Sequence, residues 1–163
     1  MISTTVWAKE KAPVHREHGA HVHGSAKLAI AFDQLQGQIE FRCAAEGVLG
    51  FEHKASSAKD KRTLVEATEN FDKKINQMIV FDPALGCQIK SDSVGMLPDG
   101  AHADFAAKFS VTCQKPVLGS KINFDFTRFS LLKDIDVTIL AGDLQLSTEI
   151  KGRPATVSLK KVE

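Results

Sequence analysis

Histidine is the residue type with the clearest chemical potential in this sequence. There are six histidines, and four of them lie within nine positions: His15, His18, His21, His23, His53 and His102. On a β-strand, residues two apart share a face with their backbones roughly 6.6 Å apart, so His21 and His23 can lean toward one metal ion. Imidazole binds zinc with Zn–N distances of about 2.0–2.1 Å, and it also suits copper and nickel. The pair predicts a metal site, with zinc favoured over copper or nickel.

A second pair, His102 and Asp104, has the same spacing on another predicted strand. A single carboxylate is compatible with zinc, so two such pairs on neighbouring strands would supply three or four nitrogen and oxygen ligands. His53 follows the first predicted hairpin and can complete this set or replace one member. His15 and His18 are possible additional ligands. The alternative is that these polar side chains simply face solvent.

The common catalytic motifs are absent from the sequence. The segment from His15 to His18 has the wrong order for HExxH, and the chain contains no GxSxG and no phosphate-binding glycine loop. We expect the glycine-containing stretch 47–50 to be a bend between a strand and a loop, and Glu46 and Glu52 to be exposed loop charges. The sequence therefore predicts a protein that is not an enzyme. The alternative is a zinc hydrolase with three histidine ligands and one open water position.

Three cysteines, Cys43, Cys87 and Cys113, occur without a CxxC spacing, which argues against a zinc ribbon or a thioredoxin-type motif. All three follow the inward apolar phase of predicted strands. Cys43 is expected to be a buried, inert thiol. Cys87 and Cys113 can face one another, and a disulfide between them and a pair of reduced core thiols are both open readings.

Alternation of apolar and polar residues predicts that strands dominate the chain from about residue 21. The expected strands are two runs at 21–32 and 38–46, joined as a hairpin by a turn over 33–37, and further runs at 85–91, 102–113, 122–126, 135–140, 144–150 and 155–160. One segment has helical spacing instead, with apolar residues at Leu64, Ala67, Phe71, Ile75 and Met78. Ser57 and Asp60 suit a capping box, so a helix is expected at about 58–78. The predicted fold class is mainly β, with α+β as a variant: an antiparallel sandwich or curved sheet that packs against one amphipathic helix.

Length and charge narrow the class of protein further. A chain of 163 residues is long enough for one domain, which we place at 19–163 as a metal-binding β domain after a flexible N-terminal arm at 1–18. The formal net charge of +1 offers no basic field for nucleic acid. No apolar run approaches the ~20 residues of a membrane span. The N-terminus lacks the pattern of a secretory signal, so we expect either a cytoplasmic protein or a mature form whose signal has been removed.

Five short motifs occur in order along the chain: His21-Val22-His23-Gly24, Gly50-Phe51-Glu52-His53, Gly86-Cys87, His102-Ala103-Asp104-Phe105, and Cys113 followed by Pro116. This ordered set resembles the ZrgA-like proteins, which are zinc-regulated, periplasmic zinc-binding proteins of Gram-negative bacteria. The resemblance runs from about residue 17 to residue 160. Members of that family often carry a long insertion rich in His, Asp and Glu, whereas the segment between Cys87 and His102 here is short and has no histidine. Only a compact site for one or two ions is therefore expected.

The resemblance implies a periplasmic location, a Cys87–Cys113 disulfide, and a ligand set drawn from His21, His23, His53 and His102. The expected function is zinc scavenging or zinc delivery, with a zinc importer or its binding protein as partner. Besides the hydrolase, one further alternative stays open. The chain can be an interaction module that docks on a metal transport component while its histidines are structural.

Overall fold

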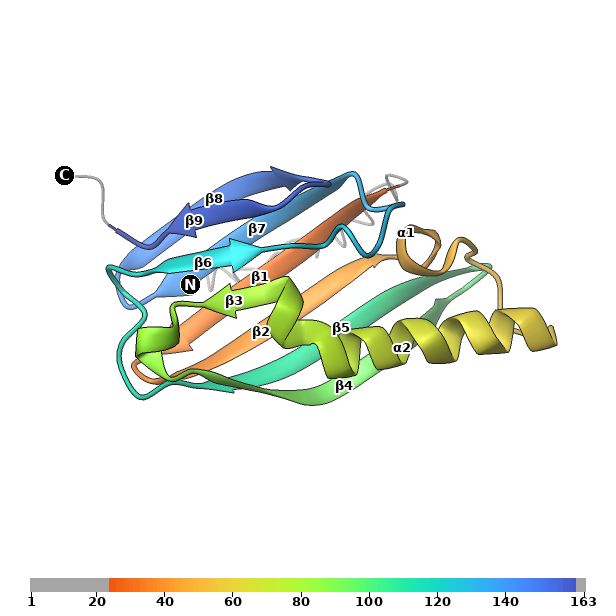
Figure 1. The fold of residues 1–163 in the computed structure, drawn as a ribbon. Helices are drawn as coiled ribbons and strands as arrows, with labels where there is room; N and C mark the ends of the chain where they lie inside the picture. Colours follow the sequence, from red (N-terminus) through yellow and green to blue (C-terminus); the bar gives the residue numbers. More distant parts are fainter. Residues whose placement is uncertain (1–23, 161–163) are drawn as a thin grey trace, which may run out of the picture.

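Strands dominate the structure and form two sheets. This structure, a computed structural model, describes residues 24–160; the predicted arm at 1–18 and the candidate ligands His15, His18, His21 and His23 lie outside the described residues. The larger sheet has the order β4-β5-β2-β1-β7-β8, and Figure 1 shows its strands side by side. Their bounds are β1 (Ser25–Asp33), β2 (Gln36–Ala44), β4 (Gln88–Asp99), β5 (His102–Thr112), β7 (Asp134–Ala141) and β8 (Leu144–Lys151).

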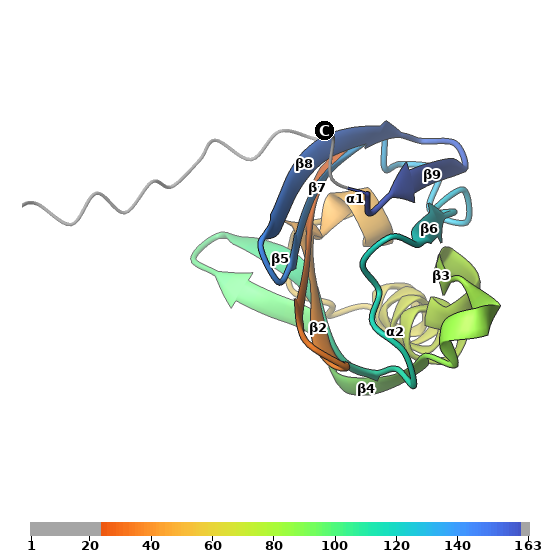
Figure 2. The same ribbon diagram turned by 90° about the vertical axis from the view of Figure 1, so that its left-hand side faces the viewer.

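A smaller, three-stranded sheet and one long helix cover the inner face of the large sheet. The small sheet has the order β3-β6-β9, formed by β3 (Ile79–Phe81), β6 (Lys121–Phe124) and β9 (Ala155–Ser158). The helices are α1 (Glu46–Leu49), α2 (Ala58–Met78) and the 3₁₀ turn η1 (Pro83–Leu85). Figure 2 shows the large sheet curving around α2 and the small sheet. The predicted sandwich with one amphipathic helix is confirmed.

The period-two pattern of the sequence is the reason that the large sheet has one apolar face. In β1, buried and exposed residues alternate strictly from Ala26 onward, and β2 pairs with it in antiparallel register from Ala26↔Cys43 to Asp33↔Gln36. The pairing is antiparallel throughout the described sheets except between β1 and β7, which run parallel. The expectation of a mostly antiparallel sheet is therefore confirmed.

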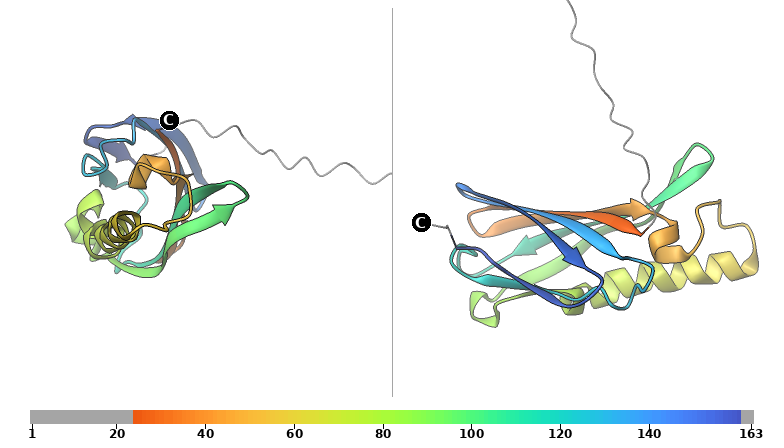
Figure 3. Two further views of the ribbon diagram at one scale, coloured as in Figure 1. Left: turned by 90° about the vertical axis from the view of Figure 1, so that its right-hand side faces the viewer. Right: turned by 90° about the horizontal axis from the view of Figure 1, so that it is seen from above.

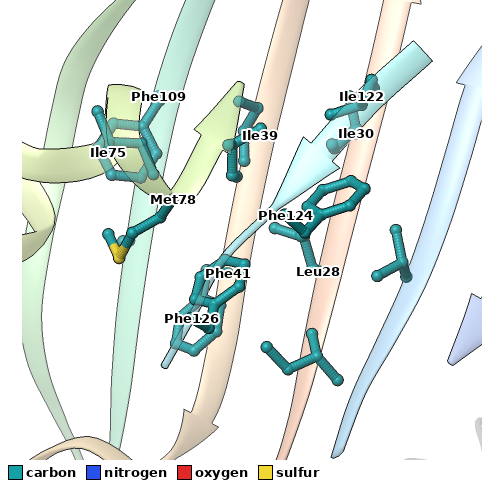
Figure 4. Packing of buried hydrophobic residues seen from close by; sticks show 14 of the residues in the cluster. Leu28, Ile30, Ile39, Phe41, Ile75, Met78, Phe109, Ile122, Phe124 and Phe126 are labelled. Carbon is teal, nitrogen blue, oxygen red and sulfur yellow. The ribbon is translucent and has the colours of Figure 1, made fainter. Parts of the chain in front are cut away.

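Aromatic rings join the helix to the sheet. The ring of Phe71 in α2 lies 4.9 Å from Phe41 and 5.0 Å from Phe105, measured between centroids. Phe41 in turn stacks on Phe126. Figure 4 shows Ile75 and other apolar side chains of this core between the layers. Fully burying one such side chain contributes roughly 1.5–3 kcal/mol, so the apolar stripe of α2 is part of the core, as its spacing predicts.

The helix begins and ends at the predicted residues. Ser57 is the N-cap: its Oγ accepts a hydrogen bond from the Asp60 backbone N–H at 3.0 Å, and Asp60 Oδ2 accepts one from the Ser57 N–H at 3.2 Å. This reciprocal capping box satisfies two donors that a helix start otherwise leaves unpaired. After Met78 the chain continues directly into β3.

Several local expectations are wrong. The first hairpin turns over two residues, with Gln34 at φ 53° and β2 already begun at Gln36, rather than over 33–37. The stretch 47–50 is not a bend but the short helix α1, which ends at Gly50 in the left-handed region that glycine adopts without strain. The predicted strand at 85–91 starts later and extends to Asp99, passing a β-bulge near Asp92. The three residues of β3 show too little alternation to be recognised in the sequence.

Strands β4 and β5 form a long hairpin that is linked at its base. Cys87 and Cys113 directly precede β4 and follow β5, and they form a disulfide, in agreement with the family resemblance. The tip of the hairpin projects from the outer side of the large sheet (Figure 2). Figure 3 shows that this tip, α1 and the loop before α2 lie at the same end of the molecule. Among residues 24–160, no helix is both long and apolar enough to span a bilayer.

Candidate metal site

His102 lies at the start of β5, directly after the turn that forms the hairpin tip. Its Nδ1 is 2.7 Å from Oε2 of Glu52, which belongs to the loop between α1 and α2. The imidazole is 63% exposed, whereas the Glu52 side chain is 17% exposed. The expectation that Glu52 is an exposed loop charge is therefore wrong, because this carboxylate is largely covered and fixed against His102.

Asp104 lies two residues further along β5, on the same face as His102. Ala103 and Phe105 point into the core, so Asp104 faces outward, yet its side chain is only 5% exposed. Its Oδ2 accepts a hydrogen bond from Nε of Arg42 at 2.5 Å. Arg42 lies on the outer face of β2, two residues before Ala44, the residue opposite Asp104. The pairing joins a covered carboxylate to a largely exposed guanidinium.

His53 has different surroundings from its sequence neighbour Glu52. Its ring stacks on Phe51 with centroids 4.9 Å apart, its Nδ1 is 3.0 Å from the Lys54 carbonyl oxygen, and the Asp60 carboxylate lies 4.0 Å away. These contacts place His53 beside the N-terminus of α2. Within residues 24–160, no three His, Cys, Asp or Glu side chains converge as a metal ion requires. His53, His102 and Asp104 therefore do not form a complete site by themselves.

Cys43 lies on the opposite side of the sheet from Asp104. It is a free, buried cysteine, and burial, together with the negative charge of nearby Asp104, raises the pKa of its thiol to about 12. Metal binding and nucleophilic attack both require the thiolate. The predicted inert role of Cys43 is in agreement with these surroundings.

The contributions of Glu52 and Arg42 were missed in the sequence. Glu52 is part of the Gly50-to-His53 motif, so its place beside a candidate ligand was the available signal. Arg42 alternates outward on its strand like many solvated residues, and nothing in its spacing marks it as the partner of an aspartate 62 residues away.

Comparison with known proteins connects the sequence with zinc. A family model described as ZrgA family zinc uptake protein matches residues 20–159, nearly the whole chain. The chain belongs to the ZrgA family. The match spans all five sequence motifs, and membership of the ZrgA family gives the protein a zinc-related role. No curated protein matches the sequence.

Proposed function

We propose that this protein is a periplasmic zinc-binding protein that scavenges zinc or carries it toward an importer. Zinc is its cargo, held by histidine side chains at the end of the large sheet where β1 and β5 begin. The observation that carries the proposal is the 2.7 Å contact between His102 and Glu52 at this end. Family membership supplies the connection with zinc.

The contact with Glu52 prepares His102 for a metal ion. In a neutral imidazole one nitrogen carries the proton and the other the lone pair. A carboxylate oxygen can only accept, so Nδ1 donates to Oε2 of Glu52 and the lone pair belongs to Nε2. Histidine ligands of metals commonly donate their other ring nitrogen to a carboxylate in this way, which fixes the ring and raises its basicity.

The topology of the sheet supports the inclusion of His21 and His23 in the same site. Ala26 of β1 pairs with Cys43 of β2, which pairs with Phe105 of β5, so these three residues form one row across the sheet. Adjacent strands lie about 4.8 Å apart. Moving toward the N-terminus from Ala26 leads to the end of the sheet where Asp104 and His102 lie. His23 directly precedes Gly24, the first residue that the structure describes, and we propose that it contributes to the site at this end.

The chemistry of the donors fits zinc. We propose His21, His23 and His102 as ligands, with Asp104 as a fourth. Imidazole nitrogens with one carboxylate form a typical tetrahedral zinc set, whereas magnesium and calcium prefer all-oxygen sites. Copper and nickel suit imidazole as well, so they are the metals against which selectivity must be measured. His53 contacts Lys54 and Asp60 instead, so we do not include it among the four proposed ligands.

We propose binding and transfer without catalysis. Two carboxylates lie beside the proposed site: Glu52 contacts His102, and Asp104 contacts Arg42. Because each carboxylate is already bound to a neighbouring side chain, neither is well placed to act as a general base. The Cys87–Cys113 disulfide is compatible with the periplasm, because disulfides persist in oxidising compartments.

Equilibrium titration of the folded protein against a competing chelator tests the proposal. The expected result is stoichiometric zinc uptake by the wild-type chain, with copper and nickel compared in the same assay. The variant with His21→Ala and His23→Ala is expected to lose this uptake while its circular dichroism spectrum stays unchanged. Absence of zinc uptake by the wild type would overturn the proposal, and zinc-dependent ester hydrolysis would favour the hydrolase.

A further inference from the structure

Arg42 contributes a permanent positive charge beside the proposed zinc site. Its Nε lies 2.5 Å from Oδ2 of Asp104, the carboxylate two residues from His102 on the same face of β5. The Asp104 side chain is almost fully covered, whereas that of Arg42 is 61% exposed. Hydrogen bonds between charged groups are among the strongest in proteins. Arg42 therefore holds the Asp104 carboxylate firmly through Oδ2.

A second cation lies next to Arg42. In the pairing of β1 with β2, Lys27 is directly opposite Arg42 on the outer face of the sheet. Like charges at directly opposed positions of a sheet repel each other. On its other side, Lys27 is paired with Asp136 of β7. The arrangement favours an Arg42 side chain that turns away from Lys27, toward Asp104 and the end of the sheet with His102.

We propose that Arg42 determines the affinity of the zinc site by weakening it, so that zinc remains exchangeable. This inference rests on the proposed function. Arg42 acts in two ways: it occupies Oδ2 of Asp104, which restricts this carboxylate to one-oxygen coordination, and its charge offsets that of the aspartate. A protein that passes zinc on needs a site that also releases it, and a fixed neighbouring cation supplies this property without any conformational change.

The size of the effect follows from Coulomb's law. Zinc bound by one oxygen of Asp104 at about 2.0–2.2 Å lies within about 7 Å of the guanidinium, because Nε of Arg42 is 2.5 Å from the other oxygen. Arg42 and His102 are largely exposed whereas Asp104 is covered, so an effective dielectric constant between about 20 and 80 applies. After screening by salt, repulsion between a doubly and a singly charged group at this distance corresponds to about a tenfold change in affinity.

The test compares the zinc affinity of Arg42→Gln with that of the wild type by chelator competition. Glutamine removes the charge and keeps an amide that can donate to Asp104. We expect binding about tenfold tighter and a correspondingly slower release of zinc to a chelator in stopped flow. The matched control is Lys108→Gln, because Lys108 lies on β5, the strand of Asp104, on the same outer face of the sheet, in an exposed ion pair with Glu40. It is four residues from Asp104, about 13 Å away and beyond the screening length of about 8–10 Å, so its affinity should equal that of the wild type.

A second pair of variants covers the case in which Arg42→Gln does not fold because Asp104 is left as a buried charge without its arginine. Asp104→Asn and the double variant Arg42→Gln/Asp104→Asn both lack this charge, and the double variant should bind zinc more tightly than the single. Equal or weaker binding in either comparison overturns the role of Arg42.

If the wild type binds zinc and loses it with His21→Ala/His23→Ala, the proposed function stands even when the role of Arg42 fails. If the wild type binds no zinc, both fail.

Discussion

His102 and Glu52 are 50 residues apart in the sequence, and a hydrogen bond of 2.7 Å joins Nδ1 of one to Oε2 of the other. Glu52 belongs to the loop that leads from α1 into α2, and His102 begins β5 at the tip of the long hairpin. The contact therefore ties two surface segments together at one end of the large sheet. It also connects two of the sequence motifs, which gives a physical reason for both to occur in one chain.

Replacing Glu52 with glutamine is expected to weaken zinc binding by at least about tenfold, the lower end of the effect seen when a carboxylate behind a metal-binding histidine is lost. The amide keeps the shape of the side chain but replaces the carboxylate that holds the His102 ring. Chelator competition measures the change. Glu66→Gln, on the exposed side of α2, is the matched control and should bind zinc like the wild type. Equal affinities for Glu52→Gln and Glu66→Gln would show that Glu52 does not support a metal ligand.

The histidines are expected to separate into two classes. His102→Ala should weaken zinc binding more than about 100-fold, because losing a direct ligand costs more than losing its carboxylate partner. His53→Ala should leave the affinity nearly unchanged, because this ring contacts Phe51, Lys54 and Asp60. Isothermal titration of both variants gives the comparison. A large loss in His53→Ala with a small one in His102→Ala would place the site at the start of α2 instead.

Much of the fold follows from the sequence because its signals are local. The strict alternation in β1 and the three- and four-residue spacing in α2 each report a half-buried element, and Ser57 with Asp60 marks the start of the helix. The strand bounds that were predicted wrongly depend on contacts between distant parts of the chain. The outer half of β4 carries Gly95 and Pro98 and has no regular alternation; it is a strand because β5 pairs with it.

The candidate site was predictable only in part. The spacing of His102 and Asp104 places them on one face of a strand, and the structure agrees. Their partners depend on which strands and loops become neighbours, since Glu52 and Arg42 are brought to β5 by tertiary contacts over 50 and 62 residues. A pattern of side chains along one strand carries no information about such contacts.

Removing the disulfide is expected to lower stability without changing zinc affinity. The Cys87–Cys113 link closes a loop with a sequence separation of 26, and the chain-entropy estimate for such a loop is about 3.5 kcal/mol. The link lies at the base of the β4–β5 hairpin: Cys113 is eleven residues from His102 along the chain, and thus about 37 Å from the proposed site. Urea unfolding of Cys87→Ala/Cys113→Ala should show the loss, with chelator competition unchanged. A large drop in zinc affinity with little loss of stability would contradict the placement of the site at the hairpin tip.

Stability at acid pH is expected to depend on the capping box of α2. Hydrogen bonds from Ser57 hold the pKa of Asp60 below its ordinary value of 3.8. The folded state therefore keeps Asp60 ionised at a pH where the unfolded chain already binds a proton. Its stabilising contribution is complete above the ordinary pKa and is lost as the pH falls through the lowered one. Thermal unfolding between about pH 5 and pH 2 should show a smaller acid-induced decrease for Asp60→Asn and Ser57→Ala than for the wild type. Parallel curves for all three proteins would mean that the capping box does not contribute to the acid sensitivity of the fold.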